Sequence, residues 1–515
     1  MNRCVKFLLI FTSVAFGGTF AFAGPTMISG NVSGAWDLSG SPYYITADST
    51  VPTGSSLTID PGVQVILGEG ISFTIYGTLT AVGTTNNHII FKAVNNDIKY
   101  KQIHVINGSS TTTLSEFVYC DFSNAEKALY LHAYGRIING VTVLKTNVQH
   151  CTFSDSDIGI YAHGEGHDYS YAMSMKRAHA SVDPVIKGCT FESNVDSITM
   201  YIQGDGSSWY SAGKTAAIVQ NNVFLNSSGA ALNMLAGSHP SHSGSPSFFN
   251  NTIVNCERGA WIQDSKYDAT IENNIIYGAI TAIEKVGTTG SAAYFNCFYD
   301  NTANFIGYSS TYGDIVMVNA NGEPCDIGFN IFLDPKLVSG DYHITEDSPC
   351  IDAGSSDDAP NVDIDGESRP QLYGIDIGAD EFYQKELFAK AGPDLSICTQ
   401  ICEQVTLNGS KSYALSSTIT SYDWTLAHRS EFTYDQTATG PNPTISNLAL
   451  GIYDVTLTIT DDGGVQSTDL MILTVKDDCN LCSVMQGDLN GDGDVDGKDL
   501  AIFSHYYGSE SVSGD

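Results

Sequence analysis

The sequence predicts an all-β protein: a parallel β-helix solenoid, then an immunoglobulin-like β-sandwich, then a short EF-hand-like calcium-binding helical tail. The first observation is a tripeptide that recurs through the middle of the chain, opening with Cys or Asn and ending with a large apolar residue. The second is a set of strands at sandwich spacing after residue 390. The third is a twelve-residue, Asp-rich loop near the end. We therefore expect domains at 24–384, 385–477 and 478–515.

The first 23 residues have the pattern of a signal peptide. Arg3 and Lys6 flank the start of an apolar run, and Ala21-Phe22-Ala23 supplies a small-residue cleavage site. No later stretch is long and apolar enough to span a bilayer. We expect an exported protein without a transmembrane segment, either secreted or held at the cell surface.

Acidic residues dominate the composition. The chain has 23 Lys and Arg against 57 Asp and Glu, a formal charge of −34. Without residues 1–23, which contain two of the basic residues and no acidic one, 21 face 57 and the charge is −36. Such a chain repels nucleic acid and anionic membranes, so we expect neither as a partner.

The recurring tripeptide predicts the solenoid. Its apolar third position alternates with a polar second position, as in a strand with one buried face. Successive copies are 31, 38, 33, 29, 23 and 22 residues apart, a spacing typical of stacked coils. Asn side chains on adjacent coils can hydrogen-bond along the stack at a strand spacing of about 4.8 Å. The copies begin at Cys120, Cys151, Cys189, Asn222, Asn251, Asn274 and Asn296.

Two parts of this region resemble known β-helix proteins. Segments 54–62 and 77–83, with alternating apolar residues and Gly or Pro turns, resemble the opening coils of bacterial right-handed β-helix proteins of the pectate-lyase-like superfamily. The resemblance implies a right-handed coil over about 28–384. Segments 348–354, 363–370 and 376–382 look like the closing segment of such proteins, where we expect acidic residues to form a hydrogen-bonded end cap rather than a calcium site.

Eleven cysteines follow the signal peptide, an odd number. We expect the three that open tripeptides to form a stack of small buried side chains, because side chains stacked in register point the wrong way for a disulfide. The expected disulfides are Cys325 with Cys350, and pairs drawn from the sets Cys398/Cys402 and Cys479/Cys482.

The strands after residue 390 resemble a PKD domain, an immunoglobulin-like module of secreted bacterial proteins. The resemblance rests on segments 405–410, 421–426 and 451–461. It implies that Trp424 is the core tryptophan of a sandwich, and that the module acts as a spacer or glycan contact.

The Asp-rich loop at 488–499 fills every position of an EF-hand calcium loop. Gly493 provides the sharp turn at position 6, and oxygen ligands surround one point, as a hard cation requires. We therefore predict Ca²⁺ as a cofactor. Its ligands would be Asp488, Asn490, Asp492, Asp494 through its carbonyl, Asp496 and Asp499.

The residues that follow this loop give it a second resemblance. Asp499 at the last ligand position, leading into Leu500-Ala501-Ile502-Phe503, resembles one repeat of a type I dockerin. The resemblance implies a cohesin-like or other cell-surface partner. Dockerins pair two such repeats and often carry hydroxyls at loop positions 10 and 11, whereas this chain shows one repeat with Gly497 and Lys498 there.

The long steps between Cys120 and Asn251 contain insertions on consecutive coils, which we expect to form one wall and to hold the function. They are rich in imidazole, aromatic and basic side chains, as a saccharide groove requires. The candidate catalytic residues are Lys176, Arg177, His179, Asp157 and Asp196, and the candidate substrate-binding residues are His163, Tyr169, Trp209, Tyr210 and His239.

Three chemistries compete for this region. A lyase would use Lys176, Arg177 or a His as the base beside a uronate carboxylate. A glycoside hydrolase would use two carboxylates roughly 5–9 Å apart, Asp155 or Asp157 with Glu192 or Asp196. A metal site would use His163, Glu165 and His167, although the glycines between them favour a loop.

Two functions therefore remain open. In the first, the protein binds or cleaves a polysaccharide, as a lyase or a glycoside hydrolase. In the second, it is a non-enzymatic structural or adhesive surface protein with a rod-like β-helix. The chain lacks the Arg-x-Pro-x-x-Arg signature of pectate lyases, so a noncatalytic wall of loops remains an alternative to an active site.

Overall fold

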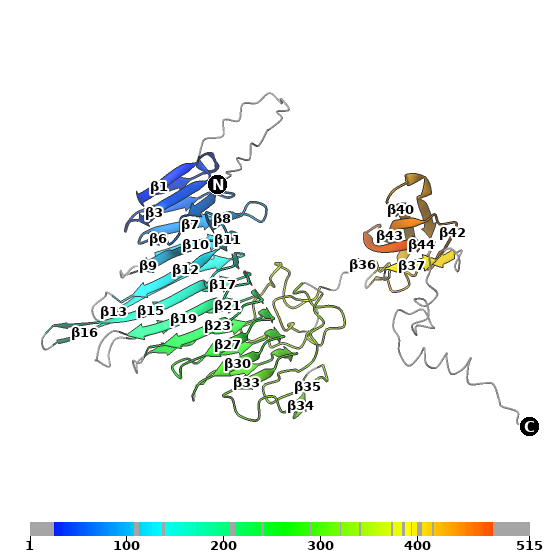
Figure 1. Ribbon diagram of the computed structural model, residues 1–515. Coiled ribbons are helices and arrows are strands. Elements are labelled where there is room, and N and C mark those ends of the chain that lie inside the picture. Colours follow the sequence, from blue (N-terminus) through cyan, green and yellow to red (C-terminus); the bar gives the residue numbers. More distant parts are fainter. Residues whose placement is uncertain are drawn as a thin grey trace, which may run out of the picture. The chain divides into compact units, whose positions relative to one another are not determined.

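The computed structural model has two compact units, residues 1–383 and 384–515, each described by itself below (Figure 1). It describes only the backbone for 113–114, 140, 167–171, 174–177 and 432. The described residues are 25–107, 113–135, 140–171, 174–204, 212–237, 242–287, 290–319, 321–338, 341–371, 374–383, 387–392, 394–398, 404–414 and 417–476.

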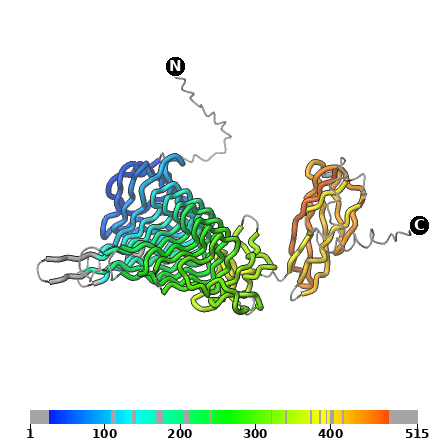
Figure 2. Tube along the Cα trace, turned by 60° about the horizontal axis from the view of Figure 1, so that its bottom comes forward, coloured from blue at the N-terminus to red at the C-terminus, as the bar shows by residue number. Residues whose placement is uncertain are grey.

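The first unit is a parallel β-helix, as predicted. Each full coil contributes a strand to each of three sheets, and successive coils pair in parallel (Figure 2). The rung sheet, which carries the recurring tripeptides, consists of β5 (Gln64–Leu67), β8 (Ile89–Ala93), β11 (Cys120–Ser123), β14 (Thr152–Ser154), β18 (Thr190–Glu192), β22 (Val223–Leu225), β26 (Thr252–Val254), β29 (Ile275–Tyr277) and β32 (Cys297–Tyr299).

The long-strand sheet follows the rung sheet along each coil. It consists of β6 (Ser72–Ile75), β9 (Tyr100–Asn107), β12 (Ala125–Tyr134), β15 (Ile158–Tyr171), β19 (Asp196–Gly204), β23 (Ala230–Ala236), β27 (Arg258–Ile262), β30 (Thr281–Lys285) and β33 (Ala303–Ile306).

The back sheet completes the coil. It consists of β2 (Gly34–Trp36), β4 (Ser56–Ile59), β7 (Thr78–Val82), β10 (Thr113–Val118), β13 (Gly140–Gln149), β17 (Val185–Lys187), β21 (Ile218–Gln220), β25 (Ser247–Phe249), β28 (Thr270–Glu272) and β31 (Ala292–Tyr294). A side branch extends it with β16 (Ser174–Val182), β20 (Gly213–Thr215) and β24 (Ser243–Gly244).

Short elements complete both ends of this unit. At the amino-terminal end β1 (Thr26–Asn31) pairs with β3 (Tyr43–Val51), η1 (Leu38–Gly40) lies between them, and β3 pairs with both β5 and β6. At the other end β34 (Met317–Val318) and β35 (Pro324–Cys325) form a small antiparallel pair.

The apolar third positions of the rungs form a stack of phenyl rings inside the coil. Ring centroids of Phe91, Phe122, Phe153, Phe191 and Phe224 follow one another at 4.9, 4.7, 4.9 and 4.8 Å. All five are at most 1% exposed. Two residues before the middle three lie Cys120, Cys151 and Cys189, which are buried and free. The predicted stack of small buried side chains is confirmed.

The Asn rungs form the predicted amide ladder. The Oδ1 of each Asn accepts hydrogen bonds from the backbone N–H and the Nδ2 of the preceding rung, at 2.9–3.0 Å. The ladder continues beyond the predicted rungs to Asn330, whose Nδ2 donates to the buried carboxylate of Asp326 at 3.0 Å. All of these amides lie in the core, so the ladder satisfies polar groups that have no access to water.

Left-handed residues bound each short rung strand. The residue before the rung and the fourth residue after its start both have positive φ, which Asn, Asp and Gly tolerate best. These pairs are Tyr119 with Asn124, His150 with Asp155, Gly188 with Ser193, Asn221 with Asn226, Asn250 with Asn255, Asn273 with Gly278, and Phe295 with Asp300.

The closing segment, residues 326–383, docks on one row of these corners. Nδ2 of Asn221 donates to the carbonyl of Val362, and Nδ2 of Asn250 donates to the carbonyl of Asp376 at 2.9 Å. Asn273 exchanges two 2.8 Å hydrogen bonds with the backbone of Ser355. The corner amides thus hold the end of the unit against earlier coils.

The acidic residues of this segment form the predicted hydrogen-bonded end cap. Asp363 Oδ1 accepts from the backbone N–H of Asp365 and Glu367, at 3.0 and 2.8 Å. The buried carboxylate of Glu381 pairs with Nη1 of Arg369 at 2.7 Å. These carboxylates therefore satisfy backbone donors and a buried guanidinium.

The predicted Cys325–Cys350 disulfide is wrong. Both cysteines are buried and free, because the closing segment folds back and brings the Cys350 thiol to that of Cys297 on β32.

The second unit is the predicted sandwich. Trp424 is 1% exposed and its Nε1 donates to the carbonyl of Gly440 at 3.0 Å, as expected for a core tryptophan. Cys398 is disulfide-bonded. One sheet consists, in order, of β37 (Leu395–Cys398), β44 (Gln466–Lys476), β43 (Gly451–Asp461), β40 (Ile419–His428) and β41 (Gln436–Thr439). Two further pairs are β36 (Leu387–Phe388) with β39 (Tyr413–Ala414), and β38 (Gln404–Thr406) with β42 (Thr444–Ser446). The short helix η2 (Phe432–Tyr434) follows β40.

The signal-peptide segment and the calcium loop at 488–499 lie outside the described residues. Among the residues that are described, no helix has the length and apolar character needed to cross a membrane.

The ladder predicts a stability effect at its centre. Asn274→Ala removes an acceptor for the N–H and Nδ2 of Asn251 and a donor to the carbonyls of Phe248 and Glu272. Because these groups remain buried, the free energy of unfolding should fall by about 2–4 kcal/mol. Denaturant unfolding of the full chain measures the change, and Asn86→Ala at an exposed turn is the control. Equal stability of the two variants would contradict this role.

Candidate functional site

The insertions between Cys120 and Asn251 leave the coil at one corner, between the long-strand sheet and the back sheet. They connect β12 to β13, β15 to β16, β19 to β20, and β23 to β24. The largest is not a loop, because β15 continues past the sheet and pairs antiparallel with β16. The expectation that the insertions share one flank is confirmed.

The antiparallel part of β15 and β16, residues 167–171 and 174–178, contains three of the candidate residues. Its backbone register sets Tyr169 opposite Lys176 and Asp168 opposite Arg177. The side chains of Tyr169, Lys176 and Arg177 are not among the described ones, and Trp209, Tyr210 and His239 lie outside the described residues. Their proposed roles remain predictions.

Three other candidates have partners within the protein. His179 is half-buried and its Nδ1 accepts the backbone N–H of Ala212 at 3.1 Å. The exposed Asp157 pairs with Lys99 at 2.5 Å. Asp196, one coil later, accepts from the N–H of Ala230 at 2.9 Å and from Nδ2 of Asn233 at 2.8 Å.

His163 lies on a strand, and the expectation of a loop around it is wrong. Gly164 and Gly166 are interior positions of β15. A Cβ on Gly164 would lie 2.5 Å from the carbonyl oxygen of Lys214, and one on Gly166 would lie 2.7 Å from the nitrogen of Ala212. These glycines are needed because the side branch of the back sheet approaches so closely here, and His163 and Glu165 point outward.

Alternation along the long strands sets a row of rings on the outside of the solenoid. Leu129 and Leu131 belong to the core, so Tyr130 and His132 face outward. Register places Tyr130 between His104 and Tyr161, and His163 between His132 and Tyr201. We call this set the imidazole face: His104, Tyr130, His132, Tyr161, His163, Glu165 and Tyr201.

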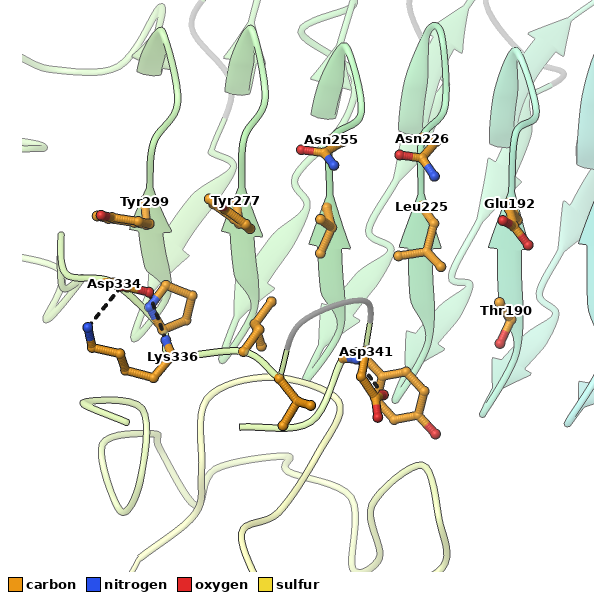
Figure 3. A pocket seen from close by; sticks show the side chains of 15 residues that line it. Thr190, Glu192, Leu225, Asn226, Asn255, Tyr277, Tyr299, Asp334, Lys336 and Asp341 are labelled. Atoms are coloured by element: carbon orange, nitrogen blue, oxygen red, sulfur yellow. Dashed lines mark hydrogen bonds and ion pairs between the residues drawn. The ribbon is translucent and has the colours of Figure 1, made fainter. Parts of the chain in front are cut away.

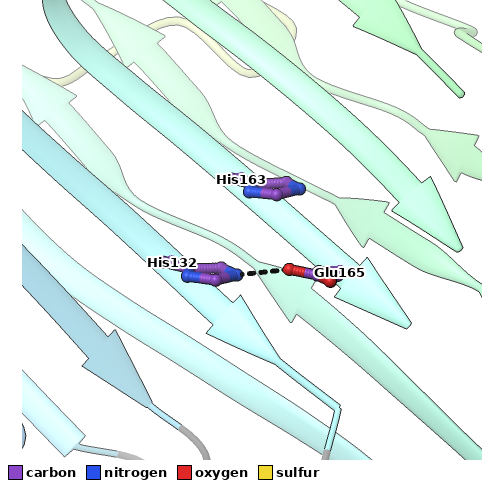
Figure 4. Close-up of side chains that lie close together, drawn as sticks. All are labelled: His132, His163 and Glu165. Atoms are coloured by element: carbon purple, nitrogen blue, oxygen red, sulfur yellow. Dashed lines mark hydrogen bonds and ion pairs between the residues drawn. The ribbon is translucent and has the colours of Figure 1, made fainter. Parts of the chain in front are cut away.

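The rings of the imidazole face contact one another along the solenoid. His132 and His163 stack at 4.6 Å with an angle of 3°, and Figure 4 shows the parallel rings with Glu165 beside His132. Tyr130 stacks on His104 at 4.3 Å. His163 meets Tyr201 at 5.1 Å. Stacking leaves His132 and His163 only 9% and 7% exposed although they point away from the core.

Burial keeps two of the imidazoles, His104 and His163, neutral. Desolvation, followed by the influence of His132, lowers the pKa of His163 to about 3. Desolvation, again with His132, lowers the pKa of His104 to about 3. Burial raises the pKa of Tyr130, so its hydroxyl keeps its proton and donates to Nδ1 of His163 at 2.9 Å. In that tautomer Nε2 of His163 carries the proton.

The second imidazole is oriented by a carboxylate. Nε2 of His132 lies 2.9 Å from Oε2 of Glu165 and donates to it, so in the neutral form of the ring Nδ1 of His132 is an acceptor. The face thus combines a donor on His163 with an acceptor on His132.

Several ring nitrogens of this face are buried without a partner among the described residues. They are Nε2 of His104, Nδ1 of His132 and Nε2 of His163, and Nε1 of Trp261 on β27 shares the property. An unpaired buried polar group costs about 1–3 kcal/mol. A row of such groups on an outward face calls for an explanation, and a ligand hydroxyl would supply the missing hydrogen bonds where it displaces a side chain that covers these nitrogens.

Among the described residues a related set of possible metal ligands forms, and the predicted set with His167 remains a prediction. His163 and Glu165 lie together, but their third neighbour is His132 from the preceding coil; the side chain of His167 is not described. The candidate ligand atoms lie within 4.8 Å of one another. A metal binds about 2 Å from nitrogen, along the lone pair in the ring plane. Two rings stacked at 3° do not direct their lone pairs to one point, so the arrangement favours a hydrogen-bonding ligand over a metal.

Comparison with known proteins identifies one segment. Residues 391–475 match a family model that describes a PKD domain. The predicted PKD resemblance is confirmed. No curated protein matches the chain in sequence.

Two solved structures are similar over part of the chain. The solution structure of the PKD domain from KIAA 1837 protein is 25% identical, with 19% of this chain and 93% of that one covered and a TM-score of 0.15. The PL6 family alginate lyase AlyGC is 11% identical, with 71% of this chain and 58% of that one covered and a TM-score of 0.21. At such scores neither likeness bears on function, and the chain spans 58% of the lyase's length.

The sequence analysis missed most of the imidazole face. His132 lies 31 residues before His163, the same step that separates Cys120 from Cys151. Applying the spacing between successive tripeptides to every residue of the coil would have placed the two histidines side by side. His104 and Tyr130 lie before the long insertions, where function was not expected.

The imidazole face predicts an unusual titration. In long-range ¹⁵N–¹H spectra of the full chain, His163 should remain neutral with its proton on Nε2 down to about pH 4, because burial lowers its pKa to about 3. An ordinary imidazole titrates near 6.5. Tyr130→Phe should remove the donor to Nδ1 and shift the tautomer. Titration of His163 near pH 6.5 in the wild type would contradict the described burial.

Proposed function

We propose that the chain is an exported, carbohydrate-directed protein that binds a polysaccharide across the imidazole face. The observation that carries the proposal is the row of buried, unpaired imidazole nitrogens among stacked rings on the outside of the solenoid. Sugar hydroxyls both donate and accept hydrogen bonds, which suits neutral imidazoles presenting one nitrogen of each kind. Aromatic faces with a few placed polar groups are typical of ligand sites.

The periodicity of the face suits a polymer. Its side chains repeat from coil to coil at about 4.8 Å, so an extended chain can meet equivalent groups on successive strands. Lys127 adds a cation at the edge, with its ammonium 5.1 and 4.6 Å from the ring centroids of Tyr130 and Tyr161. In a protein with a charge of −34, such a local cation would be needed to admit a uronate.

Cleavage is a second candidate function, and the His132–Glu165 pair favours it. A carboxylate on one nitrogen orients an imidazole so that the other can accept a proton, and it stabilises the imidazolium that forms. In a lyase, Nδ1 of His132 would take the proton from the carbon next to a uronate carboxylate. The electron pair would form the new double bond and expel the glycosidic oxygen, which is protonated by water.

The polysaccharide proposal is tested with the full chain. Isothermal titration against polygalacturonate, xylan and a soluble mixed-linkage glucan should reveal binding to at least one polymer. His163→Ala should weaken it about tenfold or more, because one hydrogen bond and one stacking contact are lost. His88→Ala, which lies off the face, is the control. Absence of binding to every polymer, or equal binding by His163→Ala, would favour the rod-like structural alternative.

The same samples test cleavage. Unsaturated products absorb in the ultraviolet, and their formation should stop in His132→Ala and slow in Glu165→Gln. Binding without products from any polymer would leave the protein a binding module and exclude the lyase role.

We also propose that the tail binds Ca²⁺ through residues 488–499, with a cohesin-like or cell-surface partner as its target. The support is the complete ligand pattern of the loop and the dockerin-like residues after it. Calorimetry of the full chain should detect one calcium site that Asp492→Ala removes and Asp314→Ala, at an exposed position, retains. An unchanged calcium isotherm in Asp492→Ala would refute the assignment.

A further inference from the structure

A groove of about 800 Å³ runs along a different flank of the solenoid (Figure 3). Its floor is the outward surface of the rung sheet. The closing segment forms the opposite wall with residues 334–338 and 341–342, which we call the strap. The floor takes one side chain from each of five successive rungs, Glu192, Leu225, Val254, Tyr277 and Tyr299.

The groove floor offers no free strand edge. The strands β18, β22, β26 and β29 pair in register with the coils before and after them, so the coil-to-coil ladder uses their backbone groups. The last strand, β32, pairs with β29 on one side and bridges Ile331 at Cys297 on the other. A peptide that adds a strand needs an unpaired edge. An occupant of this groove must therefore be recognised by side chains.

The side chains of the groove are aromatic and amide groups. Tyr277 and Tyr299 stack at 5.7 Å, and Tyr299 is 37% exposed. Asn226 and Asn255 are the exposed left-handed corners of two adjacent coils. Within the described part of the chain, neither corner amide makes a side-chain hydrogen bond. Along the groove axis the two amides, on the coils of β22 and β26, are followed by the two rings, on β29 and β32, which suits an extended ligand rich in hydroxyls.

The charges of the groove exclude an acidic ligand. Glu192, Asp334 and Asp341 are lining carboxylates, and Lys336 is the only lining cation among the described residues. Nζ of Lys336 is paired with Asp334 at 3.0 Å, so no cation is left to meet a uronate. Asp341 is held by His343 at 2.7 Å. Amides, phenols and carboxylates all bond to neutral hydroxyls, whereas they repel carboxylated sugars.

We propose that this groove is a second glycan site, which binds a neutral oligosaccharide lying along the solenoid axis. Tyr277 and Tyr299 would pack against sugar rings, and Asn226 and Asn255 would bond to hydroxyl groups. Four coil steps of about 4.8 Å give the floor a length of roughly 19 Å, enough for several sugar units. The site shares no residue with the imidazole face, so it stands independently of the proposed polysaccharide site.

The test uses the full chain carrying His163→Ala, so that binding at the imidazole face does not contribute. Cellohexaose, xylohexaose and mannohexaose are titrated by calorimetry, with hexagalacturonate as the acidic counterpart. At least one neutral hexasaccharide should bind, and Tyr299→Ala and Asn255→Ala should each weaken it about fivefold or more. Tyr76→Ala, at a tyrosine that is 44% exposed and outside the groove lining, is the matched control.

The outcomes separate this proposal from the previous one. Neutral binding that depends on Tyr299 and persists in His163→Ala supports the groove, even if the imidazole face binds nothing. Failure of all three neutral hexasaccharides to bind would overturn it, as would unchanged binding in both groove variants. Tighter binding of hexagalacturonate that Tyr299→Ala abolishes would overturn the assignment of a neutral ligand.

Discussion

The constraint on which the solenoid depends is the constant rise from one coil to the next, fixed by hydrogen bonds that run along its axis. The amide ladder is the most direct expression of it, since Oδ1 of Asn274 accepts two hydrogen bonds from Asn251 at 2.9 Å. Phenyl rings follow the same repeat at 4.7–4.9 Å. Because amide, ring and backbone ladders share one spacing, a coil that shifts breaks the backbone ladder together with the amide or ring ladder that it carries.

The same rise from coil to coil also sets the spacing of the side chains that point outward, so the surface sites have the same repeat as the core. Inside, each ladder amide has partners, as the end of the row at Asp326 illustrates. Outside, His132 and His163 stack at 4.6 Å with buried nitrogens left unpaired among the described residues. The amide ladder satisfies its own buried groups, and the unpaired imidazoles on the surface contribute nothing to it. Unpaired buried nitrogens therefore identify the candidate face better than the number of aromatic rings does.

The parts of this arrangement that repeat along the chain could be predicted from the sequence. The rungs, the buried thiols and the end cap follow from periodicity and residue type, and Trp424 follows from the sandwich pattern. His132 was not predicted because functional residues were expected in the insertions. The 31-residue spacing that pairs His132 with His163 was applied only to the recurring tripeptides. Gly164 was interpreted as part of a loop, because glycine is favoured both in loops and where two sheets approach closely. Cys350 meets Cys297, and the strap lines one groove with β18, only because the closing segment folds back, which no local pattern specifies.

The net charge of the chain explains why both proposed ligand sites consist mainly of uncharged side chains. A chain with 57 acidic and 23 basic residues cannot build a cationic groove without neutralising it, as Lys336 beside Asp334 illustrates. The imidazoles avoid this because burial lowers the pKa values of His104 and His163 to about 3, so they neither attract acids nor repel sugars at neutral pH. Their hydrogen bonds are available because they remain uncharged. The aromatic rings beside the imidazoles provide contact area without charge, so both flanks are suited to hydroxyl-rich polymers. Among the described residues of the imidazole face and its edge, Lys127 is the cation that could pair with a carboxylate.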